Sequence, residues 1–263
     1  MATRITLHDL LQAKGKRTWV QVHVDTAAEA AAAAAAGIGI LSCEADATLP
    51  AVRAAAPLAF ITAGMPHGAA ATPDEAVRMA FDTLRKGADA VYTSHSPRFV
   101  EAMAREGIPV AGHVGLVPNL AAWTGFRAIG RKADEALKVL RQAKDIENAG
   151  AACLEVEVVP VQLADHITRA TPMITMGMGC GTVCDTQYLF SCDVLGTNRG
   201  RYPRHSRRYA DLARLEDELQ DQRVQAFRAF VADVESRGYP QRGHEVWMDE
   251  AEAAAFADRV AKV

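Results

Sequence analysis

Short apolar runs alternate with amphipathic stretches along most of the chain. Eight such runs predict β-strands over Trp19–Val24, Ile38–Cys43, Leu58–Ala63, Ala90–Thr93, Val110–His113, Ala152–Val158, Met173–Met176 and Cys192–Leu195. Apolar positions at helical spacing predict helices over Ala27–Ala36, Pro73–Lys86, Pro97–Arg105, Ala133–Ala149 and Gln162–Ala170. Strands and helices in alternation predict an α/β protein, and eight strands favour a (β/α)8 TIM barrel over a doubly wound sheet.

The C-terminal part of the chain has a different pattern. A basic loop, Arg199–Arg208, precedes a long, highly charged amphipathic stretch that predicts a helix over Leu212–Glu235. We therefore predict one barrel domain over residues 1–263, in which residues 199–263 form the basic loop and a C-terminal helical extension. We expect this extension to pack outside the barrel or on another subunit.

Composition narrows the functional classes. The chain has 263 residues, 49% hydrophobic and 23% charged, which is ordinary for a soluble globular protein with a sizeable core. Its net charge of -3 gives no reason to expect nucleic acid or an anionic membrane as a partner. No apolar run approaches the ~20 residues of a membrane span. Five scattered cysteines indicate reduced thiols, so we expect a cytoplasmic protein. We expect its partner to be a small-molecule substrate.

The most informative segment is Leu154–Pro160, an apolar run that carries two carboxylates. Side chains alternate along a strand, so Glu155 and Glu157 point to the same face. Catalytic groups of a barrel lie at the C-terminal ends of its strands, where His113 and several other polar residues also collect. Each residue has a structural alternative: a hydrogen-bonded core histidine for His113, a barrel-interior cation partner for Glu157 and a purely structural role for Glu155.

Several segments together resemble one enzyme family. They are Ala71–Ala76, Lys86–Asp89, Pro109–Pro118, Glu147–Ala151, Leu154–Leu163, Gly177–Asp185, Tyr202–Arg204 and Val234–Pro240. In this order, over nearly the whole chain, they are similar to the ketopantoate (3-methyl-2-oxobutanoate) hydroxymethyltransferase family. That family belongs to the phosphoenolpyruvate mutase/isocitrate lyase group of barrels. The Gly-His-Val-Gly-Leu-Val-Pro and Glu-Val-Val-Pro blocks are the most specific.

The resemblance implies a reaction and two catalytic residues. Enzymes of this family attach a hydroxymethyl group from methylenetetrahydrofolate to a branched 2-oxo acid, and a magnesium ion stabilises the enolate that forms. By position, Glu157 matches the family's acid/base glutamate and His113 matches a histidine beside it. The resemblance also implies a homo-oligomer.

The chain departs from the family at the metal site. Gly64 and Ser94 stand where the family has metal-associated carboxylates, and Tyr92 replaces a lysine. The segment after the second strand is short, which predicts a truncated second helix. Magnesium prefers oxygen ligands, and Glu44 and Asp46 remain as replacements in this region. Histidines at the same barrel end could instead supply nitrogen ligands to a transition metal.

The remaining substrate contacts are expected at strand ends. They are Tyr92, Ser94, His67, Gly177 and Gly179, of which the glycines belong to a glycine-rich turn.

Three functional classes stay open. The first is the family type of aldol-like carbon–carbon bond formation or cleavage at a 2-oxo acid, with Glu157 as the acid/base, and this is the one we favour. The second is a metal-independent lyase, hydrolase or isomerase on the same barrel that uses Glu157, His113 and either Cys43 or His95, with Cys43 as a candidate nucleophile. The third is a non-catalytic relative that binds a metabolite.

Overall fold

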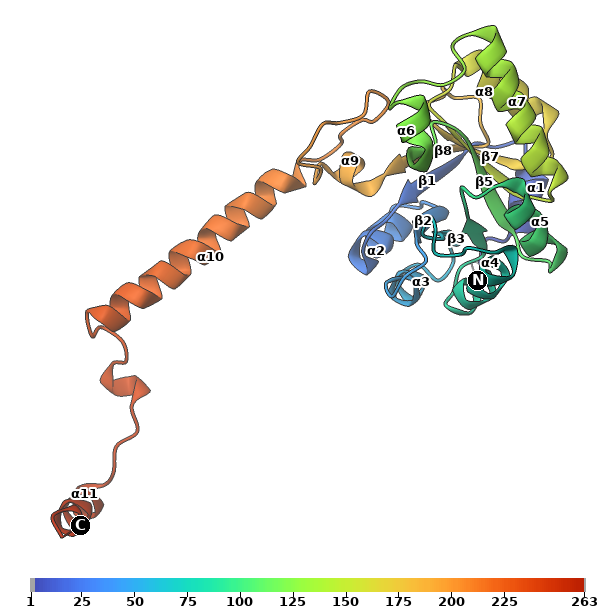
Figure 1. The fold of residues 1–263 in the computed structure, drawn as a ribbon. Coiled ribbons are helices and arrows are strands. Elements are labelled where there is room, and N and C mark those ends of the chain that lie inside the picture. Colours follow the sequence, from blue (N-terminus) through green and yellow to red (C-terminus); the bar gives the residue numbers. More distant parts are fainter. Residues whose placement is uncertain (1–2, 263) are drawn as a thin grey trace. The chain divides into compact units, whose positions relative to one another are not determined.

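The computed structural model describes residues 3–262 and contains a closed barrel of eight parallel strands (Figure 1). Neighbouring strands pair in chain order, and β1 closes the barrel against β8. The strands are β1 (Trp19–His23), β2 (Ile40–Glu44), β3 (Phe60–Gly64), β4 (Ala90–Tyr92), β5 (Val110–Gly115), β6 (Cys153–Glu157), β7 (Ile174–Met178) and β8 (Thr186–Phe190). The predicted (β/α)8 barrel is confirmed.

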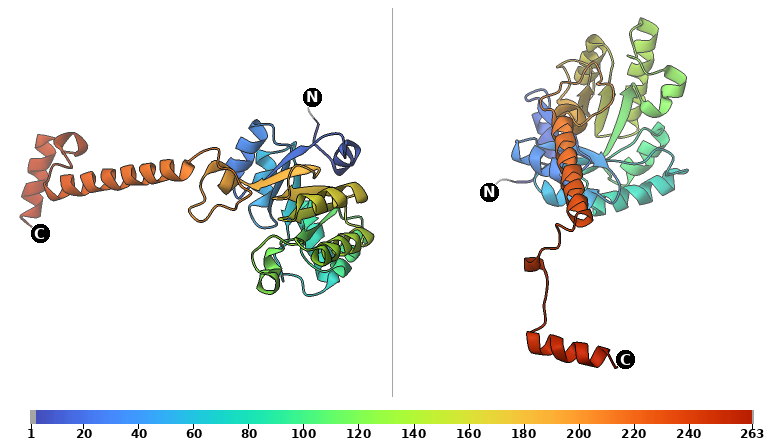
Figure 2. Two further views of the ribbon diagram at one scale, coloured as in Figure 1. Left: turned by 90° about the horizontal axis from the view of Figure 1, so that it is seen from above. Right: turned by 90° about the vertical axis from the view of Figure 1, so that its left-hand side faces the viewer.

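Helices alternate with the strands and surround the barrel (Figure 2). The helices between strands are α2 (Ala27–Ala35), α3 (Leu49–Ala55), α4 (Pro73–Arg85), α5 (Pro97–Arg105), α7 (Ala133–Asn148) and α8 (Val161–Ala170). The helix after the second strand, α3, is short, with 7 residues. Residues 179–185 join β7 directly to β8. Four short elements complete this part: α1 (Leu7–Ala13), η1 (Pro118–Leu120), α6 (Ala121–Thr124) and α9 (Ser191–Leu195).

Helix α4 shows how local sequence sets an element boundary. The Thr72 hydroxyl accepts a hydrogen bond from the Glu75 backbone N–H, and the Glu75 carboxylate accepts one from the Thr72 N–H. Pro73 occupies the first helical position, where a missing N–H costs nothing. This reciprocal cap confirms the helix start that the sequence predicts.

The prediction of the eighth strand is wrong. Cys192–Leu195 lies in helix α9, and the strand is Thr186–Phe190. An apolar run of four residues does not distinguish a strand from a helix, and Gly196 ends the helix with a left-handed φ of 73°. The true strand was missed because its alternate side chains face a polar barrel interior, so it has no continuous apolar run.

The barrel interior changes from apolar to polar along the strands. At the N-terminal end, Trp19, Ile40 and Phe60 pack with Leu10 of α1 and close the barrel. The next inward positions on these strands carry polar side chains: Gln21, Ser42 and Thr62. The interior therefore has a dry floor and a polar upper part at the C-terminal ends, where barrel active sites lie.

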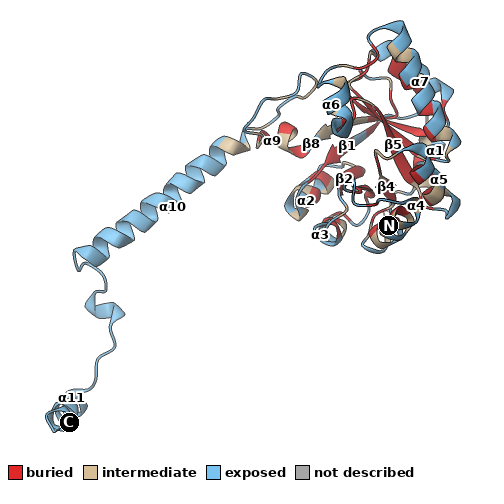
Figure 3. Cartoon of the chain, in the orientation of Figure 1, coloured by how far each residue is buried: buried red, intermediate tan, exposed pale blue. Residues whose placement is uncertain are grey.

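Outward-facing strand residues pack against the helices. Buried clusters there include Val22, Leu41 and Ile61 under α2 and α3, and Val114 and Val156 under α7 and α8. Figure 3 shows these strands and the inner faces of the helices as buried. Of the helices in residues 3–262, none combines the length and the apolarity that crossing a bilayer requires.

The chain divides into two compact units, Met1–Asp211 and Leu212–Val263. The second unit contains α10 (Leu212–Glu235), the η2 turn (Arg242–His244) and α11 (Glu250–Val260). No residue of α10 is buried, although it carries apolar side chains such as Phe227. Within this unit the Phe230 and Tyr239 rings pack edge to face at 5.4 Å. The predicted helix over Leu212–Glu235 is confirmed.

We expect Gly115→Ala to destabilise the protein strongly. Gly115 has a φ of 96°, and an added Cβ would lie 2.1 Å from the Glu157 carbonyl oxygen. The backbone strain and the overlap together should lower the free energy of unfolding by about 2–5 kcal/mol. Gly107→Ala is the control, because Gly107 has a φ of 75° but nothing within 4 Å. It should cost about 1–2 kcal/mol. Equal urea midpoints for the two variants would contradict this account.

Candidate active site

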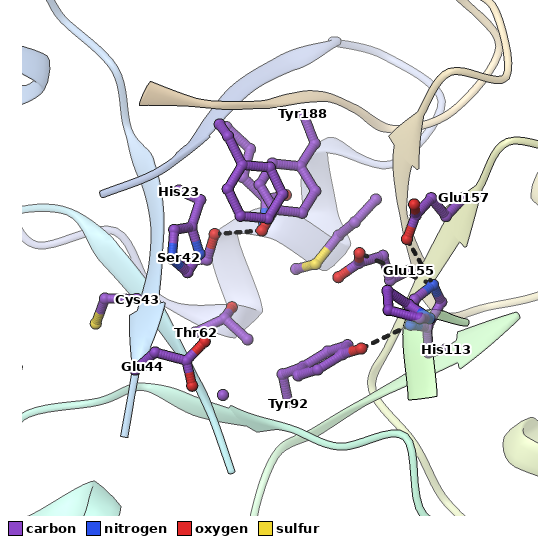
Figure 4. Close-up of a pocket in the computed structure, with 15 residues that line it drawn as sticks. His23, Ser42, Cys43, Glu44, Thr62, Tyr92, His113, Glu155, Glu157 and Tyr188 are labelled. Atoms are coloured by element: carbon purple, nitrogen blue, oxygen red, sulfur yellow. Dashed lines mark hydrogen bonds and ion pairs between the residues drawn. The ribbon is translucent and has the colours of Figure 1, made fainter. Parts of the chain in front are cut away.

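A cavity of about 220 Å³ opens at the C-terminal end of the barrel. All eight strands contribute to its wall (Figure 4). Its lining residues are Gln21, His23, Ser42, Cys43, Glu44, Thr62, Gly64, Tyr92, His113, Pro118, Glu155, Glu157, Met176, Tyr188 and Phe190. Among these described residues there is no lysine and no arginine, whereas three are glutamates.

Strand register brings the charged groups together. β5 and β6 run parallel, with His113 opposite Glu155 and Gly115 opposite Glu157. All four positions lie on the inward face, because they are spaced by two along their strands. Gly115 has no side chain, and a Cβ there would lie 2.1 Å from the Glu157 carbonyl oxygen, so this glycine allows the close approach of the two strand ends.

His113 is the centre of a buried cluster. Its Nε2 atom lies 3.2 Å from Glu157 Oε2 and 3.9 Å from Glu155 Oε1. On the other side of the ring, Nδ1 lies 2.6 Å from the Tyr92 hydroxyl oxygen. With a neutral ring that carries its proton on Nε2, the tyrosine donates to Nδ1. With a protonated ring, Nδ1–H donates to the tyrosine oxygen. Either way Tyr92 fixes the orientation of the imidazole.

The surroundings shift the pKa values of two members of this cluster. Burial raises the pKa of Glu155 to about 7, and Glu157 adds to the rise while His113 opposes it. Burial disfavours a charged His113, but the two carboxylates outweigh it and raise the pKa of the imidazole. The cluster therefore holds protons near neutral pH instead of standing fully ionised.

Two buried polar atoms of the lining have no hydrogen-bond partner, His113 Nε2 and Thr62 Oγ1. Nε2 is within ion-pair distance of Glu157, but its N–H is not aligned with the carboxylate as a hydrogen bond requires. Buried polar groups are normally paired, so these two atoms are positioned for the polar groups of a bound molecule.

Comparison with solved structures shows the fold. The chain superimposes on 2,3-dimethylmalate lyase, a phosphoenolpyruvate mutase/isocitrate lyase superfamily member, with a TM-score of 0.51 and 12% identity, covering 97% of this chain and 99% of the other. A putative lyase/mutase from Burkholderia cenocepacia gives 0.53 and 12% identity, with 95% of each chain covered.

Sequence comparison shows the family. Residues 5–242 match the model of ketopantoate hydroxymethyltransferase. The chain belongs to the ketopantoate hydroxymethyltransferase family. The 3-methyl-2-oxobutanoate hydroxymethyltransferase of Pyrobaculum aerophilum is 32% identical over 93% of this chain and 99% of its own. One from Methylibium petroleiphilum is 34% identical over 81% of this chain and 71% of its own. The predicted resemblance is confirmed, and with it a transferase family.

Only some of the predicted substrate contacts reach the cavity. Tyr92 lines it, whereas Ser94 and His67 lie at the barrel rim, where Ser94 Oγ is 3.3 Å from His67 Nδ1 and accepts a hydrogen bond from Asn119. Gly177 is on the outward face of β7, and a Cβ there would lie 2.7 Å from the Cys184 Cβ. Gly179 and Gly177 line a separate cavity beside Gln187.

The family's magnesium ion does not fit the residues at the predicted positions. Glu44 lines the cavity, but Asp46 does not; its Oδ1 accepts hydrogen bonds from the Thr48 N–H and hydroxyl. Within residues 3–262, His113, Glu155 and Glu157 are the set close enough, at 4.8 Å, to surround a cation. The two carboxylates raise the pKa of the His113 imidazole, and this opposes its use as a metal ligand, which requires the neutral ring.

Cys43 is poorly suited to act as a nucleophile. It lies on β2 between two inward positions, and its side chain packs with Val22 and Leu49 in the layer under the helices. Figure 4 shows the sulfur pointing away from the labelled cluster. Burial raises the pKa of the thiol to about 12, so the reactive thiolate is scarce at neutral pH.

The β8 side of the cavity is not predicted from the sequence. Tyr188 is buried there, and its hydroxyl lies 2.8 Å from Ser42 Oγ. Phe190 packs against the His23 ring at a centroid distance of 4.6 Å. The alternation in Thr186–Phe190 was the available signal, because every second residue is β-branched or aromatic.

We expect Tyr92→Phe to destabilise the fold by about 1–3 kcal/mol, because it leaves the buried Nδ1 of His113 without a partner. Tyr209→Phe is the matched control, since this tyrosine is 68% exposed; its effect should stay within about 0.5 kcal/mol. Urea denaturation of both variants measures the difference. A Tyr92→Phe variant as stable as the control would mean that the hydroxyl does not hold the imidazole.

Proposed function

We propose that this chain forms or breaks a carbon–carbon bond beside the carbonyl group of a small 2-oxo acid, with Glu157 as the acid/base. The observation that carries the proposal is the contact of 3.2 Å between Glu157 and His113 in a cavity at the C-terminal end of the barrel. Family membership supports the reaction type.

The proposed reaction begins with proton transfer. The Glu157 carboxylate takes the proton from the carbon next to the carbonyl, and the electron pair of the broken C–H bond forms the enolate. Negative charge develops on the carbonyl oxygen, which accepts a hydrogen bond from the His113 Nε2–H beside Glu157. A positioned acid/base of this kind contributes about 10²–10⁴-fold to the rate.

The size of the cavity supports a small substrate. At about 220 Å³ it is below the roughly 300–1,000 Å³ typical of sites for drug-sized ligands. A short branched 2-oxo acid is of the right class. Methylenetetrahydrofolate is the proposed one-carbon donor, by analogy with the family, and it supplies a carbon at the oxidation level of formaldehyde. A cavity of this size does not enclose a whole folate, so the donor would approach from the mouth.

The oligomeric state of the protein and its cellular compartment are predictions. The family resemblance predicts a homo-oligomer, for which light scattering on the full chain is the measurement, and the composition predicts a cytoplasmic protein. No nucleic acid or membrane is proposed as a partner.

The direct test of the proposed reaction is deuterium exchange at the β-carbon of 2-oxoisovalerate in heavy water. We expect exchange to proceed and to persist in excess chelator. The proposed proton transfer uses the carboxylates and the imidazole of the cluster, which do not fit magnesium. No exchange under either condition would remove the proposed function. Exchange only with added magnesium would keep the reaction type and overturn its metal independence.

We expect Glu157→Gln to lower this exchange rate by about 10²–10⁴-fold, since the amide cannot accept the proton. Glu101→Gln on α5 is the control. Glu101 pairs with Arg105 at the surface and is not one of the residues that line the cavity. This variant should exchange at the wild-type rate. Undiminished exchange in Glu157→Gln would contradict the acid/base assignment.

A further inference from the structure

We propose that Glu155 is a catalytic residue which, in its protonated form, donates a hydrogen bond to the oxygen of the enolate. This inference rests on the proposed enolate chemistry. In this proposal a neutral carboxylic acid stabilises the negative charge of the enolate, a role that would otherwise require a cation.

The geometry places Glu155 beside the reacting groups. It lies two residues before Glu157 on the same inward face of β6, and its carboxylate is 3.9 Å from His113 Nε2. Figure 4 shows Glu155 and Glu157 pointing into the same part of the cavity. An oxygen atom that accepts from Nε2 therefore also lies within reach of the Glu155 carboxyl group.

The charge balance of the cavity requires a proton. Glu155 and Glu157 are buried in its wall and Glu44 lies at the exposed end of β2, without a lysine or arginine among the described lining residues. An anionic 2-oxo acid would add a further negative charge, and a buried charge without a partner is costly. Protonation of one glutamate removes a charge and supplies a donor in the same step.

The distances to His113 distinguish the two buried glutamates. Glu157 lies 3.2 Å from Nε2 and Glu155 lies 3.9 Å away, so the imidazole pairs more closely with Glu157 and Glu155 is the one that keeps the proton. Burial raises the pKa of Glu155 to about 7. The titratable or charged groups that face it come from several strands: Tyr92 from β4, His113 from β5, Glu157 from β6, Tyr188 from β8 and, across the cavity, Glu44 from β2 and His23 from β1. Of these only the histidines can be positive. Carboxylic acids kept neutral by apolar surroundings act as hydrogen-bond donors to enolates in other enzymes.

The proposed step balances without an added reagent. Glu157 gains the proton from carbon, the C–H electron pair becomes the enolate, and Glu155 keeps its own proton within a hydrogen bond to the enolate oxygen. When the enolate carbon bonds to a C=O carbon at the oxidation level of formaldehyde, the π pair of that C=O becomes an alkoxide, which takes the proton back from Glu157. The carbonyl of the 2-oxo acid is restored in the same step and the Glu155 hydrogen bond weakens. Stabilisation is thus greatest where the charge is greatest.

Two substitutions of Glu155 distinguish a role as a hydrogen-bond donor from a role as a charged carboxylate. Glu155→Gln keeps a neutral hydrogen-bond donor of the same shape, so it should retain deuterium exchange within about 10-fold of wild type. Glu155→Met has a similar size and no donor, so exchange should fall by about 10²–10³-fold, as for the loss of one oxyanion donor. If the Glu155→Gln variant is as inactive as Glu155→Met, or if a chelator abolishes wild-type exchange, then the site requires the negative charge of the Glu155 carboxylate. Either result would show that the proposal is wrong.

The pH dependence gives a second readout. The protonated acid is present below the pKa of Glu155, so wild-type exchange should fall as pH rises through about 7. In Glu155→Gln that fall should disappear. A fall of the same size in the Gln variant would assign the titration to another group and overturn the proposal.

Infrared spectroscopy tests the proton without any turnover. The wild-type protein should show the carbonyl stretch of a protonated carboxylic acid that disappears as pH rises through about 7, and Glu155→Gln should lack this band. A band that persists in the variant would sink the assignment. Because this measurement needs no substrate, an intact band without deuterium exchange would reject the proposed reaction while the protonation of Glu155 stands.

Discussion

The burial of two carboxylates around one imidazole is the constraint on which this site depends. Glu155 and Glu157 are nearly removed from water at the upper end of the barrel, and the described wall offers no lysine or arginine to neutralise them. Their charge is tolerable only because His113 stands between them and because protons are retained. Tyr92 secures the far side of the ring, so that the imidazole keeps one orientation.

The barrel accommodates this arrangement by separating an apolar floor from a polar upper layer. Trp19, Ile40 and Phe60 close the floor with α1, and the polar layer begins one inward position higher on the same strands. The buried charged groups lie on β5 and β6.

Much of the fold was predictable, because the alternation of apolar runs and amphipathic stretches reports burial directly. Seven of the eight predicted strands overlap strands of the barrel, and helix α4 begins where its cap residues indicate. The eighth strand was not predictable in this way. Thr186–Phe190 contributes Tyr188 to a polar interior, so its hydrophobic pattern is broken, while the short apolar run after it forms α9.

The sequence by itself determined the family, the barrel and the pairing of Glu155 with Glu157 on one face, since these follow from local motifs and from the two-residue period of a strand. Only the tertiary structure decided which candidates meet. It brought His113 and Tyr92 to the two glutamates, left Asp46 in a surface turn and turned Gly177 outward against the cysteines. Strand register and burial set those contacts and the pKa of Glu155, and both depend on residues far apart in the chain.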